Sequence, residues 1–99
     1  MTNNLIIVPE LSKAITTALK ECKNPYAQTY LQAIPLAIEE GIQMGMGAES
    51  GLKTQLLYCL SNMAHWRGET AKECKSVIKK YANGSDKLFV TIPENMHNN

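Results

Sequence analysis

The sequence lacks the spaced residue pairs that usually identify a catalytic or metal-binding protein. Its three cysteines have no CxxC spacing, and its two histidines form no HxxxH or HExxH pair. A zinc site is therefore not expected. The glycines of residues 41–51 are not followed by a GK[ST] motif and follow no β-strand pattern, so we interpret them as a flexible connection rather than a phosphate-binding loop.

Charge of one sign and long apolar runs are also scarce. The formal net charge is +1 at pH 7, with a mildly acidic first half and a mildly basic second half. Strong attraction to nucleic acid or to a membrane is therefore not expected. No stretch approaches the roughly 18 apolar residues of a membrane span, and residues 1–4 lack the basic start of a signal peptide. With an odd number of cysteines, we expect buried, reduced thiols and a cytoplasmic protein.

No pair of side chains has the spacing that catalysis requires. Cys59 and His65 fall on different faces of one expected helix, and His97 lies near the end of the chain. The neighbouring carboxylates Glu39 and Glu40 point to different sides of a helix, which does not favour acid–base catalysis. We therefore expect no enzymatic activity, no cofactor and no metal ligand.

The apolar spacing predicts a mainly α fold, a compact bundle of about four helices in one small domain of residues 1–99. Asn24 and Pro25 end the first helix and start the second, and Pro35 predicts a kink or a break in that second helix near residues 31–33. Residues 51–82 predict two further helices joined by a tight corner at residues 65–69.

The two ends of the chain are β-branched runs closed by proline, at residues 5–8 and 87–93. We expect short extended segments there, which pair either with each other or with a second copy. Residues 94–99 are expected to be a disordered tail. Together with a stripe of small residues at Ala37, Gly41 and Gly45, these segments favour a homodimer or a higher oligomer.

The corner carries the only Trp beside the only Arg, and both types are enriched at binding centres. A row of lysines on the last helix projects beside this corner. The row is either a plain solvated face or a contact surface for an acidic partner or a phosphate backbone. The predicted contact surface comprises Tyr58, His65, Trp66, Arg67, Lys72, Lys75 and Lys79. For Trp66 itself, packing between the last two helices is the alternative interpretation.

The same region resembles the helix-turn-helix of DNA-binding proteins over about a fifth of the chain. The matching positions are Met63, Ala64, Gly68, Cys74 and Val77. The polar residues beside Gly68 and the carboxylates Glu69 and Glu73 depart from that pattern, since carboxylates at the start of a recognition helix repel phosphate.

Our leading hypothesis is a non-enzymatic intracellular interaction or regulatory protein that binds a host protein. By analogy of size and composition, it resembles the small accessory proteins of phages and mobile elements. The alternative is a helix-turn-helix transcriptional regulator, and a third hypothesis is an oligomer that binds a small anionic ligand between subunits.

Overall fold

The computed structural model describes residues 5–91, which form five helices and a two-stranded ribbon. In chain order the elements are β1 (Leu5–Ile7), α1 (Pro9–Glu21), α2 (Pro25–Gln32), α3 (Ile34–Gln43), α4 (Ala48–Ser61), α5 (Glu69–Asn83) and β2 (Phe89–Thr91). The mainly α class is as predicted. The count is five rather than four because the expected second helix is divided, and the predicted tail at residues 94–99 lies outside the described residues.

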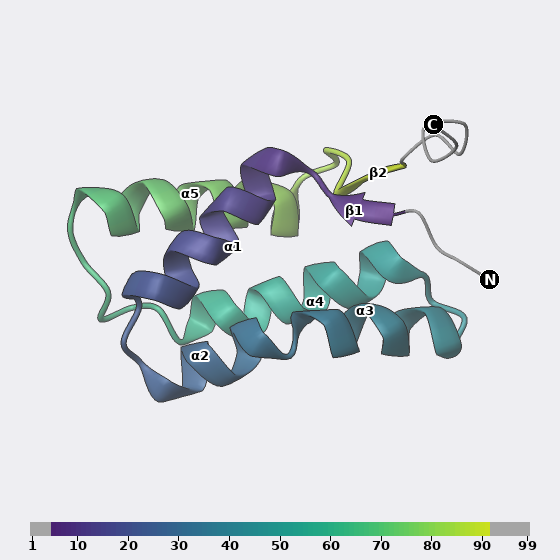
Figure 1. Ribbon diagram of the computed structural model, residues 1–99, viewed down its shortest axis with the longest axis horizontal. Helices are drawn as coiled ribbons and strands as arrows, with labels where there is room; N and C mark the ends of the chain where they lie inside the picture. The colour runs from purple at the N-terminus through teal and green to yellow at the C-terminus, as the bar shows by residue number, and fades with distance from the viewer. Residues whose placement is uncertain (1–4, 92–99) are drawn as a thin grey trace, which may run out of the picture.

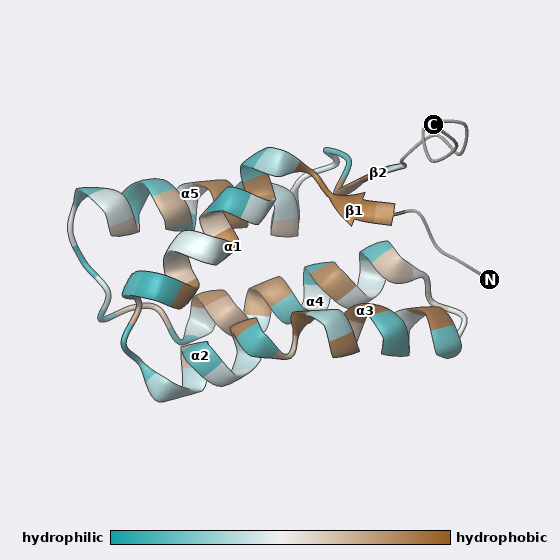
Figure 2. Ribbon diagram, in the orientation of Figure 1, coloured by the Kyte–Doolittle hydropathy of each residue, from teal (hydrophilic) through white to brown (hydrophobic). Residues whose placement is uncertain are grey.

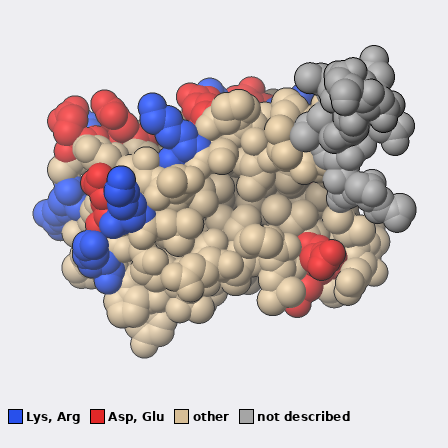
Figure 3. Space-filling model, in the orientation of Figure 1, with Lys and Arg blue, Asp and Glu red and all other residues tan. Residues whose placement is uncertain are grey.

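The helices form two layers, with α1 and α5 in one and α2, α3 and α4 in the other (Figure 1). Helix α4 contacts α2 and α3 in its own layer and α5 in the other, so it is the central helix that its wide apolar arc predicts. Acidic and basic side chains concentrate over the α1/α5 layer, whereas uncharged residues cover most of α2 and α3 on the face drawn in Figure 3.

Two prolines set the boundaries of α2 and α3. The Asn24 side chain accepts hydrogen bonds from the Tyr26 and Ala27 amides at 2.8 and 3.0 Å, and so caps α2. Of the kink or break predicted near residues 31–33, the structure has the break: α2 ends at Gln32, and Ala33 (φ −89°, ψ 5°) separates it from α3. Pro35 then lies in the first turn of a new helix, where its missing N–H costs nothing.

Glycines bring α3 and α4 into close contact. A Cβ on Gly51 would collide with the Ala37 carbonyl oxygen, and one on Gly41 would collide with the Gly47 carbonyl oxygen. Ala37 and Gly41 of the predicted stripe therefore pack against α4 of the same chain, whereas a Cβ on Gly45 would meet no atom within 4 Å. The connection is also shorter than the flexible loop expected from the glycines, since α4 already begins at Ala48 and Gly45 (φ 77°) ends α3 in the left-handed conformation.

The terminal strands pair with each other, which is the first of the two predicted alternatives. They are antiparallel, with Ile6 opposite Val90, and the Val8 amide donates to the Leu88 carbonyl at 2.9 Å. Leu88 is fully buried and anchors the ribbon to the helices.

Figure 2 shows β1 as strongly hydrophobic, whereas α1 and α5 alternate between hydrophilic and hydrophobic stretches. The largest fully buried side chains are Leu11, Leu31, Leu52, Leu56, Met63, Ile78 and Leu88.

Candidate functional site

The corner between α4 and α5 spans residues 62–68 and is longer than the tight turn expected from the sequence. Helix α4 stops at Ser61 although the apolar spacing continues as far as Trp66. The Ser61 hydroxyl and the Asn62 amide each donate to the Tyr58 carbonyl, at 3.1 and 3.0 Å. Such side chains compete with backbone N–H groups for the last carbonyls of a helix, so the helix ends there.

Lys75 fixes the conformation of the corner from α5. Its ammonium donates hydrogen bonds to the backbone carbonyls of Met63 at 3.0 Å and of Trp66 at 2.6 Å. Lys75 is half-buried, and hydrogen bonds from a charged donor are stronger than neutral ones. This lysine, predicted as part of a contact row, is therefore mainly engaged in holding residues 62–68 in place.

The corner presents its side chains in two different ways. Trp66 is half-buried and packs against the hydrophobic core, as the packing interpretation proposed, while its edge still lines the surface hollows. His65 and Arg67 on either side of it are exposed. The predicted Trp–Arg pair thus combines an anchored ring with an accessible guanidinium.

Two adjoining hollows run along α5 beside the corner. The first, of about 450 Å³, extends from Trp66 and Arg67 to Lys72 and Lys75. The second, of about 510 Å³, continues to Lys79 over an apolar floor. Because the two share three residues, we treat them as one α4–α5 groove. Its lining consists of Leu60, Ala64, Trp66, Arg67, Gly68, Glu69, Lys72, Lys75, Ser76 and Lys79.

The basic side chains of this groove have no acidic partner among residues 5–91. None of Arg67, Lys72, Lys75 and Lys79 has a carboxylate oxygen within the 4.0 Å of an ion pair, whereas Lys80 on the same helix has two such contacts. Among the residues that the structure describes, Glu69 at the start of α5 is the only carboxylate that lines the groove. The groove therefore carries a positive charge that the described part of the chain does not neutralise.

The two remaining residues of the predicted contact surface do not line the groove. Tyr58 is half-exposed and stacks on Tyr30 of α2, with ring centroids 5.5 Å apart. His65 lines a further hollow of about 440 Å³ that shares Trp66 and Arg67 with the groove and extends to Glu21 and Lys23. Five of the seven predicted residues thus line the groove, and the predicted surface did not include its other five lining residues, Leu60, Ala64, Gly68, Glu69 and Ser76.

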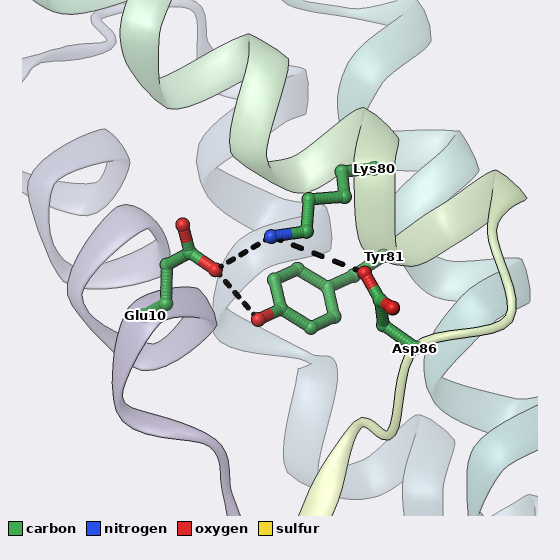
Figure 4. A network of polar contacts seen from close by, with 4 residues as sticks. All are labelled: Glu10, Lys80, Tyr81 and Asp86. Atoms are coloured by element: carbon green, nitrogen blue, oxygen red, sulfur yellow. Dashed lines mark hydrogen bonds and ion pairs between the residues drawn. The ribbon is translucent and has the colours of Figure 1, made fainter.

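A polar network joins the start of α1 to the end of α5 (Figure 4). Glu10 Oε1 accepts from the Tyr81 hydroxyl at 2.7 Å and from the Lys80 ammonium at 3.0 Å, and Asp86 lies 3.9 Å from that ammonium. The bond from Tyr81, followed by the one from Lys80, lowers the pKa of Glu10 below its usual 4.5. The same carboxylate raises the pKa of Tyr81 and of Lys80. No sequence pattern predicts this network, because Glu10 and its partners on α5 are about 70 positions apart.

The thiols are not available for nucleophilic chemistry. Cys22 and Cys59 are fully buried, and Cys74 is 7% exposed and donates to the Ala14 carbonyl at 3.4 Å. Burial raises the pKa of Cys59 to about 12, so this thiol stays protonated. His65 does not share a helix with Cys59, because α4 ends before it. Residues 5–91 contain no group of three side chains that would hold a metal ion.

Comparison with known proteins found no family model, no curated protein and no solved structure that matches this chain. Within residues 5–91, none of the helices has the length and apolar character needed to cross a membrane. The functional argument therefore depends on the corner and the α4–α5 groove.

Proposed function

We propose that this chain is a non-enzymatic interaction protein, which binds a protein partner through the corner (residues 62–68) and the neighbouring flank of α5. Trp66 and Arg67 would form the centre of the contact, with Lys72 and Lys79 beside them. Arg and Trp side chains contribute a disproportionate share of the binding energy in protein interfaces. An anchored indole next to an exposed guanidinium supports such a role for this corner.

The observation that carries this proposal is the pair of hydrogen bonds from Lys75 to the Met63 and Trp66 carbonyls. A corner without such bonds would have to become ordered on binding, at a cost in conformational entropy. Because Lys75 already holds the carbonyls of Met63 and Trp66, the backbone that carries Arg67 is ordered before any partner arrives. An ordered backbone lowers the entropy cost of binding at this corner.

The chemistry of the described side chains supports binding rather than catalysis. The three thiols are buried, with Cys59 held in its protonated form. The pKa of the Glu10 carboxyl is lowered by hydrogen bonds that join α1 to α5, and Glu10 lies outside the groove. Neither group is placed to act on a molecule bound beside Arg67.

DNA binding by α5 is the second candidate, and the unpaired lysines of that helix favour it. Two features weigh against it. The connection at residues 62–68 is longer than the turn of about three or four residues in a helix-turn-helix. Glu69 and Glu73 lie in the first turns of α5, the part that enters the major groove in such proteins.

Affinity capture with the full chain as bait tests the proposal. The wild-type chain, Arg67→Ala and Lys13→Ala are compared, since Lys13 is an exposed lysine of α1 away from the groove. We expect a defined protein to be retained by the wild type and by Lys13→Ala, and to be lost with Arg67→Ala. Circular dichroism checks that all three chains have the same helix content.

Two outcomes would contradict the proposal. In one, the Arg67→Ala chain retains the same proteins as the wild type. In the other, a DNA duplex binds with an affinity that falls steeply with salt and requires Lys72 and Lys79, which would favour the second candidate.

A further inference from the structure

We infer that the segment bound in the α4–α5 groove is an acidic amphipathic helix, with carboxylates on successive turns and small apolar side chains between them. This inference rests on the proposed function and names the chemistry of the partner. It follows from three features of the groove: its unpaired positive charge, its apolar floor and the spacing of its lysines.

The positive charge comes from one flank of α5 and from the corner. Lys72 and Lys79 are exposed and, like Arg67, have no carboxylate partner in residues 5–91. On the opposite flank, Lys80 contacts both Glu10 and Asp86. The same helix therefore has one flank whose charge is neutralised within the chain and one whose charge is left for a partner.

The four cations of the groove have different tasks. Lys75 already donates two hydrogen bonds to the corner, so it supplies mainly positive potential. Lys72 and Lys79 have ammonium groups free to donate to incoming carboxylates. Arg67, at the end of the groove, can take one carboxylate through two parallel hydrogen bonds, a geometry specific to guanidinium groups.

The spacing of the lysines matches a helix better than a flat surface. Lys72 and Lys79 are two turns apart on α5, which is about 10 Å along the axis at 1.5 Å per residue. A partner helix that lies along the groove and carries a carboxylate on every turn, about 5 Å apart, would present one to Lys72 and, two turns further on, one to Lys79. Leu60 and Ala64 form the floor between them and would contact its intervening apolar side chains.

A nucleic-acid backbone fits the same groove less well. Glu69 lines the end of the groove beside Arg67 and repels phosphates and carboxylates alike, so the floor of the groove decides between the two occupants. The apolar floor offers nothing to a phosphate, whereas it would be buried by the side chains of a peptide helix. The low net charge of +1 also gives little long-range attraction to a polyanion.

Titration of the full chain with a synthetic probe tests this inference. The probe is a helical peptide of about three turns, with Glu at every fourth position and Ala or Leu on the same face; the matched control replaces each Glu by Gln. Trp66 is the only Trp in the chain and lines the groove, so its fluorescence reports occupancy. We expect the Glu peptide to bind at least tenfold more tightly than the Gln peptide.

Charge variants locate the binding site. Lys72→Ala with Lys79→Ala should weaken the Glu peptide about three- to tenfold, the range expected for two exposed ion pairs. Lys72→Glu with Lys79→Glu should abolish binding, and Lys13→Ala should leave it unchanged. Since Lys72 and Lys79 are exposed, these variants are expected to keep the fold, which circular dichroism verifies.

Several results would overturn the inference. Equal binding of the Glu and Gln peptides is one, and tighter binding of a DNA duplex than of the Glu peptide at the same ionic strength is another. Self-association of the chain that the Lys72→Glu/Lys79→Glu variant abolishes would instead identify a second copy as the occupant. If Arg67→Ala loses a captured protein while both peptides bind equally, the proposed function stands and only this inference fails.

Discussion

The helices within each of the two layers are packed by different kinds of contact. Helix α2 has no charged residue, α3 has only Glu39 and Glu40, and α4 has only Glu49 and Lys53. In that layer, α3 and α4 approach so closely that side chains are excluded at Gly41 and Gly51. Shape, rather than charge, sets the contact.

The α1/α5 layer depends on polar side chains as well as on its core. Glu10 of α1 accepts from Lys80 and Tyr81 of α5, and the Cys74 thiol donates to the Ala14 carbonyl. The candidate binding groove lies on the other flank of α5, where lysines have no such partners. The layer of α2, α3 and α4 is thus closely packed with few charges, whereas α5 carries both the polar contacts to α1 and the three lysines of the candidate groove.

The largest expected effect is a break in the contact between α3 and α4. Gly51→Ala would normally stabilise a helix by about 1 kcal/mol. Here the added Cβ meets the Ala37 carbonyl oxygen, which is backbone and cannot easily move. We expect the free energy of unfolding to fall by about 1–3 kcal/mol, measured by urea denaturation.

Ser50→Ala, one position earlier in α4, is the matched control and should change the free energy of unfolding by less than about 0.5 kcal/mol. A Gly51→Ala chain as stable as the wild type, or more stable, would show that α3 and α4 do not pack as closely as described.

The next effect concerns the corner. Lys75→Met keeps the alkyl stem but removes the two hydrogen bonds to the Met63 and Trp66 carbonyls. We expect the free energy of unfolding to fall by about 1–2 kcal/mol. The emission of Trp66 should also shift to longer wavelength as the corner loosens and the indole becomes more exposed to water.

Lys72→Met is the control for this substitution, because Lys72 is exposed and donates no such bonds. If both variants have the same stability and the same emission as the wild type, Lys75 does not order residues 62–68.

How far the sequence predicts these features depends on the range of the interactions. The boundary at Asn24 and Pro25 and the break before Pro35 follow from local chemistry, and both are present in the structure. The stripe that includes Ala37 and Gly41 predicts a close contact, although the partner is α4 of the same chain rather than a second copy.

Long-range contacts were not predictable in the same way. The spacing of Met63 and Trp66 favours a longer α4, but local side-chain bonds and the ammonium of Lys75 stabilise a non-helical corner instead. Whether Lys75 faces solvent or a backbone carbonyl depends on how α5 packs against the corner. The Glu10–Tyr81 bond likewise arises only after α1 and α5 are in place.

The polar network between α1 and α5 predicts a pH dependence. The pKa of Glu10 is lowered in the folded chain, so its contribution to stability is present above pH 4.5 and is lost as the pH falls through the folded value. The pKa of Tyr81 is raised, so its contribution is present below pH 10.0 and is lost as the pH rises through the folded value. The network therefore stabilises the fold between these limits.

Tyr81→Phe removes the main cause of the shift at Glu10 and should flatten the acid side of the curve of unfolding free energy against pH. The exposed Tyr26 has no such partner, so Tyr26→Phe should leave that curve unchanged. A Tyr81→Phe curve parallel to that of the wild type down to pH 3 would show that the hydroxyl does not perturb Glu10.

Removal of Lys72 or Lys79 has the smallest expected effect on stability. The sign of this effect distinguishes lysines that stabilise the fold from lysines that do not. Lys72 and Lys79 each lie one helical turn from Lys75, so the three positive charges repel one another, and none of them forms an ion pair with a carboxylate of residues 5–91. Lys72→Ala or Lys79→Ala should therefore leave the free energy of unfolding unchanged or raise it by up to about 0.5 kcal/mol, more at low salt than at high salt. Lys80→Ala should lower it, because Lys80 has Glu10 and Asp86 as partners. A chain that becomes more stable when these two lysines are removed keeps them at a cost to its own folding, which is the pattern expected of residues retained for a partner.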